Sequence, residues 1–299
     1  MLRSLGEVLE AAKAKGGSKV IAVAMAEDRE VLSAIKDAIE LGLATAILVG
    51  NQQKIVATAA EVGLDLQGIE IIHAENPTTI ARHAVQLVSS GRAQMLMKGL
   101  VSTAEIMRAA LDKEIGLRTG RVISHVALIE PKGYGRLLLM TDGGMVIAPD
   151  LKQKAQMIEN AVMIAQKLGN DRPKVAVIAA FEQVNPDMPA TVDAALLAKM
   201  ADRGQIKNCI VDGPIALDGA VSKEAADHKG MTSPVAGEAD ILLMPMIEPG
   251  NVMYKTLVYL GGGQVAGVIA GAAAPIILTS RSDTHQAKLY SIATAVVMS

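Results

Sequence analysis

The sequence predicts an α/β protein of two lobes, each a three-layer α/β/α sandwich around a mostly parallel sheet. Short runs that are apolar on both faces alternate with segments of helical spacing, which is typical of parallel strands covered by helices on both sides. The alternation breaks once, near Arg121, where a turn-rich connector indicates an antiparallel hairpin. The 299 residues are enough for two ordinary domains with sizeable cores.

The first part of the chain alternates regularly between expected strands and expected helices. Each expected strand is a short apolar or β-branched run, and the segment after it has apolar residues three or four positions apart. The expected strands lie at residues 19–26, 45–50, 70–73 and 94–98, and the expected helices at 29–41, 52–62, 78–89 and 103–115.

The pattern changes after Arg121. The runs 122–130 and 136–141 are joined by Pro131-Lys132-Gly133-Tyr134-Gly135, which predicts the hairpin. The further expected helices lie at 151–168, 191–203, 222–227, 251–260 and 283–297, and the further expected strands at 174–179, 209–212, 239–245, 265–269 and 276–279. We expect residues 1–121 and 276–299 to form the first lobe and residues 122–275 the second, with an active-site cleft between them.

Composition excludes several classes of function. A net charge of −2 gives no basic surface for nucleic acid, and one Phe, four Tyr and no Trp leave no platform for stacked bases. The longest apolar stretch, residues 265–278, contains glycine and proline and is too short to cross a membrane. Five histidines and the single Cys209 form no metal-ligand pattern, so we expect no metal. We expect a soluble, cytoplasmic protein without a signal peptide and without nucleic-acid or membrane partners.

Ser280 and Arg281 lie between an expected strand and the last expected helix. A guanidinium with five donors beside the positive end of a helix is typical of a clamp for an anion such as phosphate. The alternative is a capping box, with Ser280 at the cap and Asp283 three residues later. These residues alone leave both interpretations open.

A second candidate anion site follows the expected strand that ends at Lys98. Gly99 allows a close backbone approach, and Ser102 and Thr103 offer hydroxyls and helix-terminal N–H groups. The alternative is again a cap, because Ser102 and Glu105 fit a capping box. Caps and anion sites do not exclude each other, and open sheets bind ligands outside the carboxyl ends of their strands.

Asn251, Tyr254 and Lys255 lie at the start of an expected helix. A lysine in a first helical turn opposes the macrodipole unless an anion is present, which slightly favours a ligand there. The string that begins at Gly261 formally fits a dinucleotide fingerprint, but it follows an expected helix rather than a strand. We therefore interpret its glycines as a helix end and a turn.

Taken together and in this order, a set of short strings resembles the phosphate acetyl/butyryltransferase family. The strings are Met97-Lys98-Gly99-Leu100-Val101-Ser102-Thr103, Leu117-Arg118-Thr119-Gly120, Ser124-His125-Val126-Ala127, Ala148-Pro149-Asp150-Leu151-Lys152-Gln153-Lys154, Val211-Asp212-Gly213-Pro214, Ser233-Pro234-Val235-Ala236-Gly237, Pro249-Gly250-Asn251-Val252-Met253-Tyr254-Lys255 and Thr279-Ser280-Arg281-Ser282-Asp283. The resemblance implies reversible transfer of a short acyl group, with butyryl preferred, between coenzyme A and inorganic phosphate. It implies acyl-CoA and phosphate as partners, no permanently bound cofactor, a homodimer or higher homo-oligomer, and a fold like that of isocitrate and isopropylmalate dehydrogenases.

The resemblance also implies roles for individual residues. Ser280 and Arg281 match a Ser-Arg pair whose arginine binds phosphate in related phosphate acetyltransferases. An aspartate seven residues after that serine is the proposed partner of the base there, whereas this chain has Ala287, and the nearest carboxylate, Asp283, lies at a different spacing. The other implied roles are substrate or phosphate binding for Lys98, Ser102, Thr103, Asn251, Tyr254 and Lys255, and coenzyme A binding for Arg108.

No residue is an obvious covalent acyl carrier, so we expect direct transfer in a ternary complex. Phosphate acetyltransferase activity is an alternative within the same family. Two further alternatives are an NAD-dependent decarboxylating dehydrogenase-like enzyme, which needs metal carboxylates and a nicotinamide loop, and a non-catalytic sensor of acyl-CoA.

Overall fold

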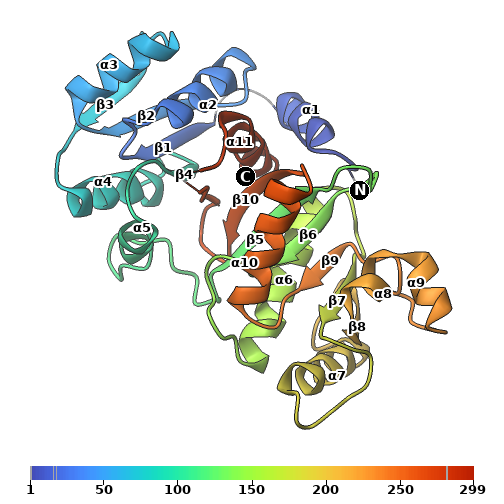
Figure 1. Cartoon of the computed structure of the whole chain (residues 1–299). Coiled ribbons are helices and arrows are strands. Elements are labelled where there is room, and N and C mark those ends of the chain that lie inside the picture. Colours follow the sequence, from blue (N-terminus) through green and yellow to red (C-terminus); the bar gives the residue numbers. More distant parts are fainter. Residues whose placement is uncertain (1, 16, 18, 281) are drawn as a thin grey trace. The chain divides into compact units, whose positions relative to one another are not determined.

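The computed structural model describes every residue except Met1, Gly16, Ser18 and Arg281. The described chain divides into two compact units, which are coloured along the sequence in Figure 1. The terminal unit comprises residues 5–121 and 265–299, and the central unit comprises residues 2–4 and 122–264. Residues 265–275 therefore group with the terminal unit, although the expected second lobe included them.

The terminal unit holds a sheet in the order β3-β2-β1-β4-β11-β10, in which only β10 runs antiparallel to its neighbour β11. Its strands are β1 (Val20–Ala24), β2 (Thr45–Gly50), β3 (Glu70–His73), β4 (Met95–Lys98), β10 (Gln264–Ala270) and β11 (Ile276–Ile277). Its helices are α1 (Leu5–Lys15), α2 (Arg29–Glu40), α3 (Gln52–Val62), α4 (Pro77–Ser89), α5 (Thr103–Ala110) and α11 (His285–Met298).

Local chemistry explains where these helices begin. Asp28, Asn51, Asn76, Ser102 and Thr284 each precede a helix and accept a hydrogen bond from a backbone N–H of its first turn. The strands between the helices are almost wholly buried, apart from the edge strand β3. Each of these helices follows a strand, and its capping residue fixes where it begins. The loop between strand and helix is therefore short and lies at the carboxyl end of the strand.

The central unit holds a second set of strands in the order β5-β6-β9-β7-β8. The strands are β5 (Ser124–Glu130), β6 (Leu138–Thr141), β7 (Lys174–Ile178), β8 (Ile210–Ile215) and β9 (Ile241–Leu243). The helices are α6 (Leu151–Lys167), α7 (Pro189–Asp202), α8 (Leu217–Val221), α9 (Lys223–His228), α10 (Ile247–Lys255) and the π-helical turn η1 (Thr256–Leu260). β5 and β6 are antiparallel and the other pairs parallel, so the predicted fold class and its hairpin are confirmed.

Four elements differ clearly from the sequence prediction. α1 and α8 were not expected, α5 ends at Ala110 rather than at residue 115, and α10 begins at Ile247 rather than at Asn251. Pro249 is tolerated because it lies in the first turn of α10, where its missing N–H would have no intrahelical acceptor. The next residue must be glycine, because a Cβ at Gly250 would lie 2.3 Å from the carbonyl oxygen of Asp142. Two residues that predict a helix break are therefore inside a helix.

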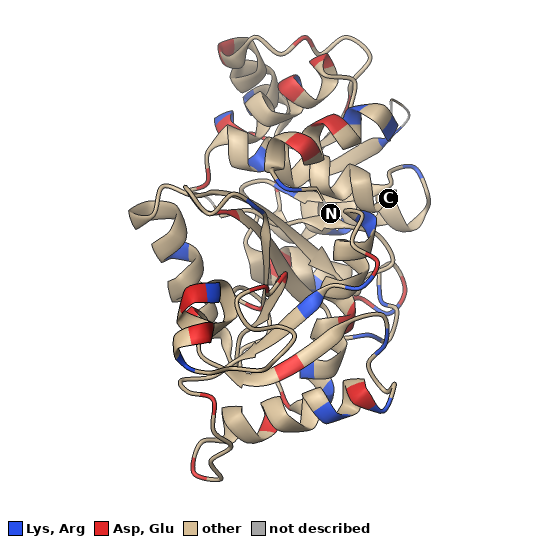
Figure 2. Ribbon diagram, turned by 90° about the vertical axis from the view of Figure 1, so that its right-hand side faces the viewer, with Lys and Arg blue, Asp and Glu red and all other residues tan. Residues whose placement is uncertain are grey.

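The surface carries charges of both signs. In the view of Figure 2, lysines and arginines are interspersed with aspartates and glutamates along the helices. Among the described residues, no helix is both long and apolar enough to cross a bilayer.

Candidate active site

The terminal unit places several predicted site residues at one edge of its sheet. β4 runs parallel to β1 on one side and to β11 on the other. The carboxyl ends of these three strands therefore meet at the same edge, with the loop after β4 between the other two. In the sheet, β1 lies between β2 and β4, so the strand order proceeds outward in opposite directions from this point. Such a reversal of strand order marks the usual ligand site of an open α/β sheet.

The loop after β4 is packed tightly against the loop after β1. The N–H groups of Gly99 and Leu100 donate to the carbonyl oxygens of Ala24 and Met25, at 2.8 and 2.9 Å. A Cβ on Gly99 would lie 2.1 Å from the Met25 oxygen, so only glycine fits at this position. Met25 itself has a φ of 61°, an uncommon conformation for a residue with a side chain.

Lys98 and Ser102 are the two ends of this loop. Lys98 is 5% exposed, and its ammonium donates to the carbonyl oxygen of Gly99 at 3.1 Å. The Ser102 hydroxyl accepts the Glu105 N–H at 3.2 Å and donates to the Glu105 carboxylate at 2.8 Å, so Ser102 does cap α5. Thr103 is the first residue of α5, whose opening N–H groups have no carbonyl acceptors within the helix. Both the cap and an anion bound at this helix end are compatible with the geometry.

The loop after β11 carries the predicted Ser280–Asp283 pair. The Asp283 carboxylate accepts the Ser280 N–H at 2.7 Å, and the Asp283 N–H donates back to the Ser280 carbonyl at 3.2 Å. The hydroxyl oxygens of Ser280 and Ser282 lie 3.0 Å apart. Arg281, the predicted phosphate clamp, lies outside the described residues.

The alternative interpretation of Ser280 and Asp283, a capping box at the start of the last helix, is wrong. α11 begins at His285, and its cap is Thr284, whose hydroxyl accepts the Ala287 N–H at 3.3 Å. The carboxylate of Asp283 turns back toward Ser280 and closes a four-residue turn instead. The turn is therefore a separate feature from the helix, and neither Ser280 nor Asp283 caps α11.

Sequence reasoning missed Lys288, which lies one turn into α11. Its side chain is 3% exposed, and its ammonium donates to the carbonyl oxygens of Asp283 at 2.6 Å and of Ser280 at 3.3 Å. A signal was present in the sequence, because Lys288 is the only Lys, Arg, Asp or Glu in the final helix. A lone charge inside an apolar helix that packs in a core often has a specific partner.

This edge of the terminal unit is suited to binding an oxyanion. It combines two buried ammonium groups, Lys98 and Lys288, with the amino-terminal ends of α5 and α11. Helix amino ends carry partial positive charge and exposed N–H donors, and buried charge is screened less than surface charge. Hydroxyls of Ser102, Thr103 and Ser280 lie on the same two adjacent loops.

The central unit holds Asn251 and Tyr254 near a loop that follows β6. The Asn251 amide donates to the Gly143 carbonyl at 3.0 Å, and the rings of Tyr254 and His125 meet edge to face at 6.3 Å. The loop is held by the buried Asp142 carboxylate, which accepts the N–H groups of His125, Gly144 and Met145 at 2.6–2.7 Å.

The inference drawn from Lys255 is wrong. Lys255 is the ninth residue of α10, which continues directly into η1, so its charge lies well past the first helical turn and does not oppose the dipole there. Arg108 is exposed in the last turn of α5. Neither side chain is directed by a described contact toward the residues at the sheet edge.

Other reactive groups are placed away from this edge or are inert. Burial raises the pKa of the Cys209 thiol to about 11, which agrees with its interpretation as a core residue. Among the described residues, no cluster of three or more His, Cys, Asp or Glu side chains could hold a metal ion.

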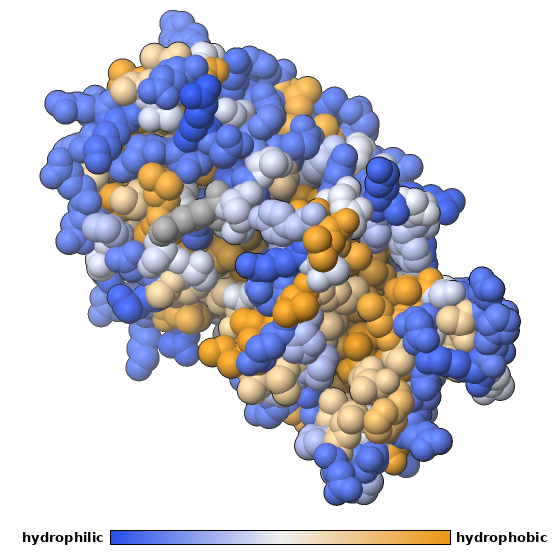
Figure 3. Space-filling view, viewed as in Figure 1, coloured by the Kyte–Doolittle hydropathy of each residue, from blue (hydrophilic) through white to orange (hydrophobic). Residues whose placement is uncertain are grey.

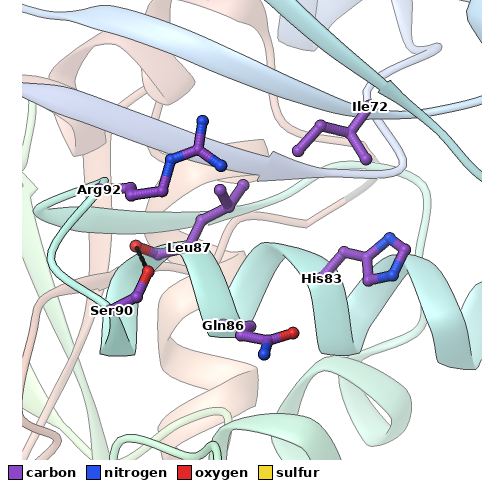
Figure 4. Close-up of a pocket in the computed structure, with 6 residues that line it drawn as sticks. All are labelled: Ile72, His83, Gln86, Leu87, Ser90 and Arg92. Carbon is purple, nitrogen blue, oxygen red and sulfur yellow. Dashed lines mark hydrogen bonds between the residues drawn. The ribbon is translucent and has the colours of Figure 1, made fainter.

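A cavity of about 350 Å³ lies along α4 (Figure 4). It is lined by Ile72 of the edge strand β3 and by His83, Gln86 and Leu87 of α4, with Arg92 from the loop that precedes β4. The Arg92 guanidinium is already paired with the Glu70 carboxylate at 2.6 Å. None of the residues that line the cavity belongs to the loops that follow β1, β4 and β11, so the cavity is a separate feature.

Comparisons with known proteins identify relatives along the whole chain. The model of the family described as "Phosphate acetyl/butaryl transferase" matches residues 5–83 and 77–296. The phosphate butyryltransferase of Clostridium acetobutylicum is 51% identical over 298 residues, covering 100% of this chain and 99% of that protein.

Solved structures agree with this result. A branched-chain phosphotransacylase from Enterococcus faecalis superposes with a TM-score of 0.83 at 34% identity, covering 94% of this chain and 98% of that one. A 4-hydroxythreonine-4-phosphate dehydrogenase from Burkholderia phymatum shares the fold alone, with a TM-score of 0.53 at 12% identity over 94% of this chain and 98% of that one. This chain belongs to the phosphate acetyl/butaryl transferase family.

Proposed function

We propose that the protein is an acyltransferase that moves a short acyl group, with butyryl preferred, reversibly between coenzyme A and inorganic phosphate. The observation that carries this proposal is a family match that extends from residue 5 to residue 296. The positively polarised edge of the terminal unit supports it, because both phosphate and the acyl phosphate product are oxyanions.

The phosphate is proposed to bind at the loops after β4 and β11. Lys98 and Arg281 supply positive charge, and Ser102, Thr103 and Ser280 supply hydroxyl and backbone donors. A bidentate guanidinium contact would fix the orientation of the phosphate as well as its position. Asp283 is proposed as a further catalytic residue beside them. In the structure, its carboxylate accepts the Ser280 N–H.

The reaction requires one bond to form as another breaks. A phosphate oxygen attacks the thioester carbonyl, the carbonyl oxygen becomes an oxyanion, and the carbon–sulfur bond then breaks to release coenzyme A as a thiolate. In the reverse direction the thiol, with an ordinary pKa of about 8.5, must lose its proton before it attacks. Donors aimed at the oxyanion lower the barrier, and orientation of both substrates in one complex removes several kcal/mol, on the order of the values for intramolecular reactions.

The coenzyme is proposed to contact residues outside the phosphate loops. Asn251, Tyr254 and Lys255 of α10 remain candidates for substrate binding, and Arg108 remains a candidate for the phosphates of coenzyme A. A cytoplasmic location is proposed because both substrates are intracellular metabolites.

The length and branching of the acyl group are open to a direct test. A single methylene changes binding by only about 1–3 kcal/mol, so related acyl groups should differ in kcat/KM by roughly 10- to 200-fold at most. The relatives include proteins named for butyryl and for branched-chain substrates. We expect butyryl-CoA to have the highest kcat/KM, followed by isobutyryl-CoA and propionyl-CoA.

The experiment measures thiol release from acetyl-, propionyl-, butyryl- and isobutyryl-CoA with phosphate. Direct transfer predicts intersecting double-reciprocal plots when both substrates are varied. Parallel plots, or a labelled acyl-enzyme, would show a covalent intermediate instead. Thiol release that does not depend on phosphate would reject the proposed reaction.

A homo-oligomer is the proposed assembly. The surface of α10 and η1 exposes several large apolar side chains, with Val252 at 63%, Tyr259 at 57% and Leu260 at 84%. Apolar residues gather over α10 in Figure 3. A cavity of about 360 Å³ beside Met253 and Leu257 adds a concave apolar surface to the same region. A second copy of the chain is the proposed partner for it.

A further inference from the structure

Lys288 is a buried cation for which the described protein supplies only neutral partners. Its two acceptors are main-chain carbonyl oxygens of Ser280 and Asp283, and no carboxylate lies within ion-pair distance among the described residues. An ammonium has three donors, so these two contacts do not use its full capacity. A buried charge with neutral partners retains a substantial desolvation cost.

The position of Lys288 on its helix adds to that cost. Lys288 is the fourth residue of α11, where the helix dipole is positive and disfavours a second positive charge. Both costs fall when an anion is bound nearby. The site that the loops after β4 and β11 form, in the same unit, is the one that the proposed function fills with phosphate.

We propose that Lys288 is a positioning residue for the phosphate in the acyl transfer proposed above. Its ammonium holds the carbonyl groups of Ser280 and Asp283, which are the first and last residues of the turn, and so sets the direction of the Ser280 hydroxyl and N–H. Its charge also raises the electrostatic potential at this edge of the sheet. Lys288 thereby acts through the turn and through the field, without a role in proton transfer.

A purely structural lysine would behave differently. It would stabilise the turn and the start of α11, and its loss would lower the melting temperature and the amount of folded enzyme. It would leave the KM values of the folded fraction unchanged. The two roles are therefore separated by KM for phosphate, measured apart from kcat and from KM for acyl-CoA.

The test compares Lys288→Met, Lys288→Gln and Lys288→Arg with the wild type. The Met variant keeps the volume without the charge, the Gln variant keeps an N–H donor without the charge, and the Arg variant keeps the charge. We expect KM for phosphate to rise about tenfold or more in the Met and Gln variants, with KM for butyryl-CoA within about twofold, and Arg to recover most of the loss.

Lys15→Met is the control for the loss of a lysine contact to the same helix. Lys15 also donates to a main-chain carbonyl of α11, that of Val297 at 2.5 Å, but at the other end of the helix. Its replacement should lower the melting temperature and leave both KM values unchanged. An unchanged KM for phosphate in the Gln or Met variant would overturn the proposal, and the Gln variant serves alone if the Met variant does not fold.

A second readout separates this inference from the proposed function. Inorganic phosphate should raise the melting temperature of the wild type above that in chloride at matched ionic strength, and the increase should be smaller in Lys288→Gln. A wild type that binds phosphate in this way but transfers no acyl group would reject the proposed reaction and leave the role of Lys288 in place. An equal increase in both proteins would reject the role of Lys288.

Discussion

At the scale of single residues, contacts with the main chain of the loops distinguish the residues of the proposed site from an equally buried but inert group. Lys98, Asp283 and Lys288 are all less than a tenth exposed, yet each is tied to main-chain groups of two adjacent loops. Cys209 is as buried but lies in the core next to β8 and has no such connection. The location of a buried polar group, at a loop that follows a parallel strand, is therefore a better guide to a site than the chemical type of the group.

Arg281→Ala is predicted to raise KM for phosphate or lower kcat, with a combined loss in kcat/KM for phosphate of about 10²-fold or more. The reason is the loss of the one bidentate donor expected for the phosphate. Kinetics with phosphate and butyryl-CoA varied separately provide the measurement. Arg82→Ala is the control, because Arg82 is half exposed and paired with Asp112 at 3.0 Å, and near wild-type constants in Arg281→Ala would reject the clamp.

Cys209 is predicted to resist alkylation in the folded protein. With a pKa of about 11, roughly one thiol in a thousand is ionised at pH 8, and the thiolate is the reactive form. Mass spectrometry after iodoacetamide treatment should find little modification under native conditions and complete modification in denaturant. Rapid alkylation of the native protein together with loss of activity would point to a functional thiol.

At the scale of elements, the site depends on how closely two loops approach each other. The loop after β4 donates two hydrogen bonds to the end of β1, and the absent side chain of Gly99 makes that approach possible. On the other side, β4 is paired with β11, whose following turn is held by Asp283 and Lys288. The three strand ends therefore form one support for the loops that we propose bind phosphate.

Gly99→Ala is predicted to destabilise the fold by about 2–3 kcal/mol and to raise KM for phosphate, because the methyl group forces the loop away from Met25. Chemical denaturation and steady-state kinetics test the two effects. Gly68→Ala is the comparison, since Gly68 has a φ of 79° with open space around it, and its replacement should cost stability without changing either KM. Normal phosphate kinetics in Gly99→Ala would show that the loop's position is not critical.

At the scale of the whole molecule, the chain is divided between two compact units of similar size. The terminal unit takes residues from both ends of the chain, so the turn that carries Ser280 belongs to the same sheet as Lys98, despite the long sequence separation. The central unit contributes the hairpin and α10, together with the exposed apolar surface that we assign to self-association.

Leu260→Asp is predicted to reduce the molar mass in solution from that of an oligomer to that of one chain, because a carboxylate at the most exposed apolar position would be desolvated in the interface. Light scattering coupled to size-exclusion chromatography makes the measurement. Val56→Asp, at a side chain that is 45% exposed on α3 in the other unit, should leave the mass unchanged. An oligomer that persists in Leu260→Asp would place the interface elsewhere.

The sequence by itself determined the features that depend on local chemistry. Apolar runs and helical spacing predicted the parallel strands and most helices, and the Pro131–Gly135 connector predicted the β5–β6 hairpin. The Ser102–Glu105 pattern predicted a cap that α5 does have. These features are readable because each is specified within a few neighbouring residues.

Only the tertiary structure decided the features that depend on distant partners. Pro249 and Gly250 are helical because α10 packs on Asp142, which lies more than a hundred positions earlier in the chain. The Ser280 turn is closed by Asp283 and held by hydrogen bonds from Lys288, whereas the sequence pattern left open whether Ser280 caps a helix. Strand order places the loops after β4 and β11 side by side, and no local pattern encodes which strands are neighbours, because pairing is decided by burial of whole faces.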